Sequence, residues 1–144
     1  MGVKMKTSLT IMSVALIILL GVSSCLAVES DIDNFISTID LCNKATVLTN
    51  RLAPGVLKKE DLKTLLQYYK QAYQCSLRVD VAFLEKKYKG WGENFKILII
   101  SLKNRIEGLE GSDLKKSIIA QEYSDKWADW FSVHVKYIRK IKSY

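Results

Sequence analysis

Apolar residues recur at steps of three and four along four stretches of the chain, and each stretch ends near glycine or proline or at the C-terminus. This is the period of one face of an α-helix rather than the alternation of a strand. The stretches cover about 31–52, 58–89, 93–109 and 112–144. Amphipathic helices joined by short turns pack most simply as a bundle, so we predict an all-α fold, a four-helix up-down bundle.

The predicted inward face of each helix is a stripe of mostly aliphatic and aromatic side chains. The stripes contain Ile32, Phe35, Ile39, Cys42, Thr46 and Thr49 in the first helix, Leu65, Tyr69, Tyr73 and Ser76 in the second, Phe95, Leu98, Leu102 and Ile106 in the third, and Ile119, Tyr123, Trp127, Trp130 and His134 in the fourth. The second helix is long, and we expect it to bend near Ser76. Gly90-Trp91-Gly92 is predicted to be the turn that follows it.

The first 27 residues have the order of a secretory signal peptide. Lys4 and Lys6 form a basic start, an apolar run covers 9–22, and small residues follow. The small side chains of Cys25 and Ala27 predict cleavage after Ala27. We therefore expect a signal peptide over 1–27, a single helical-bundle domain over 28–144, and a secreted protein.

Two alternatives use the same residues. The stretch 22–25 resembles the lipobox of bacterial lipoproteins, in which Cys25 would carry the lipid that anchors the chain. If the leader is not cut, its apolar residues are barely long enough to span a membrane as a signal anchor. Basic residues before it and acidic residues after it would then place the domain outside. All three readings export the domain.

Charge and size limit the classes of partner. The predicted domain has 117 residues, which suits one domain with its own core. Without Lys4 and Lys6 the 22 basic residues become 20, against 15 acidic residues, so its formal charge is +5. A moderate positive charge favours acidic partners such as anionic lipid, sulfated glycan or nucleic acid, and it also serves solubility alone. We expect no specific nucleic acid partner.

Three cysteines occur, and Cys25 belongs to the leader, which leaves Cys42 and Cys75. An exported chain with two cysteines most simply forms one disulfide, so we predict a Cys42–Cys75 bridge. Hairpin geometry opposes this pairing. In a tight turn about Gly55 the two residues would miss one another by roughly 10 Å, whereas a bridge needs Cα atoms within about 7 Å. The bridge therefore requires a longer loop or a bent second helix.

Candidate chemistry is sparse. The only histidine, His134, stands on an apolar stripe without a nucleophile and an orienting acid beside it in the sequence. One histidine and two cysteines do not supply a zinc site, and the carboxylates near Gly108 lack the spacing of a calcium loop. We therefore predict no catalytic residues, no metal ligands and no cofactor, and expect that the protein is not an enzyme.

The C-terminal segment 136–142 holds four basic residues and no acidic one. Basic amphipathic helix ends bind anionic lipid surfaces and glycans, and they also complement the helix dipole. A polyanion or membrane contact would use Lys136, Arg139, Lys140 and Lys142. The alternative is an ordinary solvated helix end.

Three functions follow from these features. The leading expectation is a secreted helical protein that acts without catalysis, through contact with an unknown extracellular protein. The second is a carrier that holds a small apolar ligand in the bundle core. The third is membrane or polyanion binding by the basic C-terminal helix. No motif in the sequence selects a family.

Overall fold

In the computed structural model of the protein, residues 31–51 and 58–141 are described, with side chains as far as Lys136. The predicted signal peptide over 1–27, with Cys25 and both anchoring alternatives, lies outside these residues. The predicted turn at Pro54 and Gly55 lies outside them as well.

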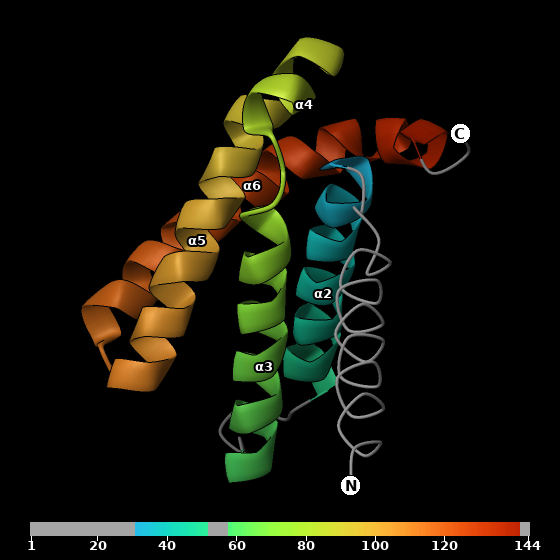
Figure 1. Ribbon diagram of the computed structural model, residues 1–144. Coiled ribbons are helices and arrows are strands. Elements are labelled where there is room, and N and C mark those ends of the chain that lie inside the picture. The colour runs from blue at the N-terminus through green and yellow to red at the C-terminus, as the bar shows by residue number, and fades with distance from the viewer. Residues whose placement is uncertain (1–30, 52–57, 142–144) are drawn as a thin grey trace, which may run out of the picture. The chain divides into compact units, whose positions relative to one another are not determined.

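The described chain is helical, as Figure 1 shows, and it contains no strand. Its helices are α2 (Asp31–Arg51), α3 (Lys59–Ser76), α4 (Val81–Lys87), α5 (Trp91–Gly111) and α6 (Leu114–Ile141). The all-α prediction is confirmed for these residues, and the ends of α2, α5 and α6 lie within a few residues of the predicted ones.

The prediction of one helix over 58–89 is wrong, because the chain leaves α3 after Ser76 and starts α4 at Val81. Asp80 sets the new start, since its carboxylate accepts hydrogen bonds from two N–H groups in the first turn of α4, at 2.9 and 3.0 Å. The N–H of Asp80 itself donates to the carboxylate of Asp31 at 2.7 Å. The turn is thereby attached to the first residue of α2.

Trp91 was expected in a turn, but it is the first residue of α5 and is only 3% exposed. The left-handed conformation that the turn needs falls on Gly90, with φ 88°. Glycine has no side chain to cap the helix, and the carboxylate of Glu85 does this from α4. It accepts from the N–H groups of Gly90 at 2.7 Å and Glu93 at 3.1 Å. These bonds, that of Gly90 foremost, lower the pKa of Glu85.

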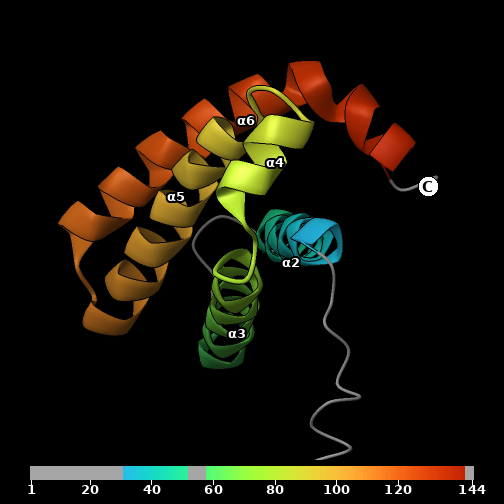
Figure 2. The ribbon, with the colours of Figure 1, turned by 45° about the horizontal axis from the view of Figure 1, so that its top comes forward.

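Helix α5 is in contact with α3, α4 and α6, whereas α2 packs mainly on α3. Figure 2 shows α5 and α6 lying side by side and α2 and α3 forming a second pair. Small residues bring α5 and α6 together: the Ser101 hydroxyl donates to the carbonyl of Ala120 at 2.8 Å. A Cβ on Gly108 would lie 2.6 Å from the hydroxyl of Ser117.

Aromatic rings join the N-terminal half of α2 to α5 and, through α5, to α6. The Phe35 ring, fully buried, meets the rings of Trp91 and Phe95 edge to face, with centroids 5.6 and 5.0 Å away. Phe95 in turn meets Trp127 of α6 at 6.3 Å. These contacts fix one end of α2 against α5 and α6.

The predicted Cys42–Cys75 disulfide is wrong, since the two cysteines are not bridged. The hydroxyl of Thr38 lies 3.4 Å from the carbonyl oxygen of Ala72, which sets the register of α2 on α3. In that register Cys42 lies opposite position 68, and Cys75 is seven residues further along, about 10 Å on a helix. Breaking the second helix after Ser76 does not help, because the break follows Cys75.

Candidate functional site

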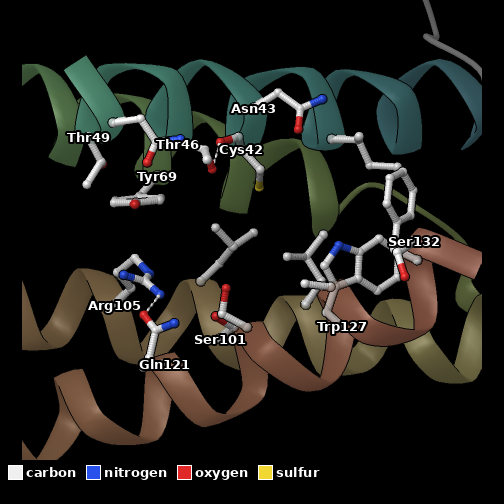
Figure 3. A pocket seen from close by; sticks show the side chains of 17 residues that line it. Cys42, Asn43, Thr46, Thr49, Tyr69, Ser101, Arg105, Gln121, Trp127 and Ser132 are labelled. Atoms are coloured by element: carbon white, nitrogen blue, oxygen red, sulfur yellow. Dashed lines mark hydrogen bonds between the residues drawn. The ribbon is translucent and has the colours of Figure 1, made fainter. Parts of the chain in front are cut away.

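A cleft of about 490 Å³ lies between α2 and the pair formed by α5 and α6, as Figure 3 shows. Side chains from these three helices line it, and Tyr69 is the contribution of α3. The cleft exists because α2 packs mainly on α3. The flank of α2 that follows Phe35 therefore faces α5 and α6 across open space.

This flank carries half of the stripe that the sequence predicts to be core. Thr46 and Thr49 are exposed, Cys42 is half-buried, and all three line the cleft. The threonine hydroxyls donate to carbonyls one turn back, at 3.0 and 2.9 Å. Helix α2 instead buries Asn34, Phe35, Thr38, Ile39 and Ala45. The stripe splits because a helix with one main neighbour buries only the part of its face that meets this neighbour.

One end of the cleft is apolar. Ile39 from α2 and Leu98 from α5 are 7% and 4% exposed and form its floor. The rings of Trp127 and Phe131 from α6 stack beside them, with centroids 5.2 Å apart and planes inclined by 29°. This end offers aromatic faces and aliphatic chains to an apolar group.

The other end is polar and holds Arg105, as Figure 3 shows. The guanidinium donates to Oε1 of Gln121 at 3.1 Å, and Nε2 of Gln121 donates to Asp125 at 2.7 Å. The guanidinium also lies 5.3 Å from the centre of the Tyr69 ring. Thr49 and Arg105 both lie beside the Tyr69 hydroxyl.

The apolar end and the polar end of the cleft are separated along the axes of α5 and α6. Leu98 and Arg105 are seven residues apart on α5, about 10 Å along its axis. On α6, Phe131 and Gln121 are ten residues apart, about 15 Å. The cleft is therefore long enough for an elongated molecule with a different group at each end.

Burial favours the protonated forms of two side chains in the cleft, Cys42 and Tyr69. Burial raises the pKa of the Cys42 thiol to about 12, and the charge of Arg105 offsets part of that rise. Burial likewise raises the pKa of the Tyr69 hydroxyl. A protonated thiol is a weak nucleophile, because the thiolate is the reactive form. The cleft thus presents hydrogen-bonding groups, one cation and apolar surface, a set suited to binding.

Of the candidate site residues that the structure describes, Cys42 lines the cleft, whereas Cys75, His134 and Lys136 do not. His134 lies on α6 outside the cleft lining, with its ring stacked on Trp130 at 4.2 Å and its Nδ1 2.7 Å from the Trp130 carbonyl oxygen. Lys136 is exposed. The side chains of Arg139, Lys140 and Lys142 lie outside the described residues.

Sequence reasoning missed Arg105, the residue that gives the cleft its charge. A signal was present: Leu98, Leu102 and Arg105 follow one another at steps of four and three on the apolar face of α5. A charged residue on an apolar stripe must find a partner or reach solvent. Here it reaches the mouth of the cleft.

Neither a known protein family, nor a curated protein, nor a solved structure matches this chain. Within 31–51 and 58–141, no helix is long and apolar enough to cross a membrane. Over the same residues, histidine, cysteine and carboxylate side chains form no group of three or more that could hold a metal ion.

Proposed function

We propose that the protein is an exported, non-enzymatic binding protein that carries a small apolar ligand in the cleft between α2 and the pair of α5 and α6. The observation that supports this is the cleft itself, which combines an apolar end at Trp127 with a polar end at Arg105. Its volume of about 490 Å³ lies within the range of small-molecule sites, roughly 300 to 1,000 Å³.

The hydrophobic effect supplies the affinity in this proposal. Ile39, Leu98 and Trp127 are already buried, so the gain would come from covering the half-buried Phe131 ring and from the ligand's own apolar surface. Apolar surface removed from water contributes about 25 cal/mol per Å². A ligand of moderate length that lies along the cleft can thus bind without a deep, closed cavity.

The test uses Nile red, an uncharged dye that becomes fluorescent in apolar surroundings. Ala128 is an exposed residue of α6 that lines the cleft, so Ala128→Trp fills the space without removing a core contact. Ala82→Trp, at an exposed position of α4, is the matched control. We expect saturable binding to the unmodified protein and to Ala82→Trp, with loss of binding in Ala128→Trp. Equal binding to all three proteins would contradict the proposal.

Export is the second part of the proposal, and it rests on the order of residues in the leader. A cut after Ala27 would release one domain over 28–144, for which a four-helix up-down bundle remains our proposed arrangement. Lipid on Cys25 and an uncut anchor remain the alternatives. Intact-mass analysis of the protein from its own host distinguishes them by the first residue and by any added lipid. Material that begins at Met1 in the cytosol would contradict export.

Contact with an extracellular protein remains a second candidate function. It is favoured by Leu114 and Ile118, which are one turn apart on α6 and 74% and 52% exposed. A pull-down from the fluid into which the protein is released tests this candidate, with the Leu114→Ser, Ile118→Ser double variant as control. A partner captured equally well by both proteins would not use this surface.

Binding of anionic lipid or glycan by the C-terminal segment remains a third candidate, supported by the exposed Lys136. Replacing Lys136, Arg139, Lys140 and Lys142 by glutamine should abolish binding to anionic vesicles. Unchanged binding would remove this candidate.

A further inference from the structure

We infer that the ligand of the cleft is a monocarboxylate with an apolar tail, held with its carboxylate on Arg105 and its tail against Trp127 and Phe131. This inference rests on the proposed function and adds the chemical class and orientation of the ligand.

The first support is the state of the Arg105 charge. Arg105 is half-buried, and among the described residues it forms no ion pair. Its neighbours are neutral: it donates a hydrogen bond to Gln121, and its guanidinium lies 5.3 Å from the centre of the Tyr69 ring. Arginines that are partly removed from water usually have an anionic partner, because a buried charge is costly without one. A carboxylate from outside the chain would supply that partner.

The second support is the way its neighbours orient the guanidinium. Asp125 holds the Nε2 group of Gln121 and so turns Oε1 toward Arg105. The Tyr69 ring packs beside the guanidinium from the side of α3, with its centre 5.3 Å away. A guanidinium has five N–H donors in a planar fork, and these contacts leave donors available for a two-point bond with a carboxylate.

The third support is the number and position of the charges. Arg105 is the only cationic side chain among the described residues that line the cleft, and no carboxylate lines it. One cation matches a singly charged head group better than a phosphate ester or a polyanion, which would require several. The apolar end at Phe131 lies about 10 to 15 Å away along the helices, which matches a chain of medium length.

The geometry also gives the direction in which the ligand lies. Phe35 lies one helical turn before Ile39 and packs on Trp91 and Phe95 of α5, beyond the residues that line the apolar end. The Arg105 end lies beside the exposed Thr49 and Asn50. The tail therefore lies at the apolar end, and the carboxylate lies at the Arg105 end beside these exposed polar residues.

The experiment compares decanoate with decanol as competitors for Nile red, because the two have equal chains and differ in the head group. We expect decanoate to displace the dye at about ten-fold lower concentration, since one charge-assisted bidentate contact at a half-exposed site contributes roughly one order of magnitude in affinity. The preference should weaken as the salt concentration rises. In Arg105→Gln the preference should disappear, and in Lys103→Gln, which removes an exposed charge on the same helix, it should persist.

Equal displacement by decanoate and decanol in the unmodified protein would overturn the inference without any variant, and so would an unchanged preference in Arg105→Gln. If Nile red binds and both competitors act equally, the proposed carrier function stands and this inference falls. If Nile red does not bind the cleft at all, the proposed function fails, and this inference fails with it. Should Arg105→Gln fail to fold, Arg105→Lys replaces it. Lysine keeps the charge but loses the two-point bond, so we expect a reduced preference for decanoate over decanol. An unchanged preference in Arg105→Lys would contradict the bidentate contact.

Discussion

Gly92 lies in a close contact between α5 and α4, and replacing it provides a sharp test of this packing. A Cβ at this position would lie 2.4 Å from the carbonyl oxygen of Val81 and 2.7 and 2.9 Å from Cβ and N of Glu85. Two of these three atoms belong to the backbone, so no side-chain rotation relieves the clash. Gly92→Ala must therefore move α4 away from α5 and disturb the cap that Glu85 provides.

The magnitude follows from two opposing effects. Overpacking a tight contact costs about 1 to 3 kcal/mol. Replacing glycine by alanine in a helix returns at most about 1 kcal/mol, and less near a helix end. We therefore expect Gly92→Ala to lower the free energy of unfolding by about 1 to 2 kcal/mol, even though alanine is the better helix former.

The matched control is Gly111→Ala at the other end of α5. There the nearest atom to an added Cβ is 4.0 Å away, and φ is not positive. This change should leave stability the same or raise it slightly. The assay is urea denaturation followed by far-UV circular dichroism, with equal slopes required before midpoints are compared. If Gly92→Ala is as stable as Gly111→Ala, the close approach of α4 to α5 is wrong.

Three further predictions follow from other contacts. Phe35→Ala should lower the free energy of unfolding by about 3 to 5 kcal/mol, because it empties a fully buried site between two rings. Phe83→Ala, at a ring 41% exposed, should cost less than about 1 kcal/mol in the same denaturation assay. Glu85→Gln should lower the melting temperature at neutral pH. This difference should vanish on acidification, since a carboxylate with a lowered pKa stabilises the fold above the pKa it has when unfolded and stops doing so as the pH falls through its folded value. Cys42 should react slowly with iodoacetamide near neutral pH and quickly after denaturation, because its pKa is raised to about 12. Rapid labelling of the native protein, or the mass deficit of a disulfide, would contradict this.

The helices could be predicted from local residues because their causes are local. The periodic apolar positions of α5 and α6 and the glycines between them specify two helices and a turn without reference to the rest of the chain. The same reasoning placed a bend near Ser76 but not a full break. The break depends on the Asp80 carboxylate, which caps α4, and on the backbone N–H of Asp80, which donates to the carboxylate of Asp31, 49 positions earlier in the chain.

The candidate site could not be predicted in this way. Cys42, Thr46 and Thr49 share the helical period of Phe35, so the sequence alone assigns them to the core. Arg105 could not be assigned to a site either, because the position of a charged residue on an apolar stripe does not show which residues will surround it. Both outcomes depend on which helix packs against which flank of α2.

By itself, then, the sequence determined that the described chain is helical, roughly where its helices begin and end, and which of their faces are apolar. Only the tertiary structure decided that α2 packs mainly on α3, that Cys42 and Cys75 miss one another by about two helical turns, and that a cleft with a single arginine remains open. The physical reason is the distance along the chain over which each interaction acts. Helix period and capping act within a few residues, whereas register and cleft shape arise from contacts between side chains that are distant in the chain.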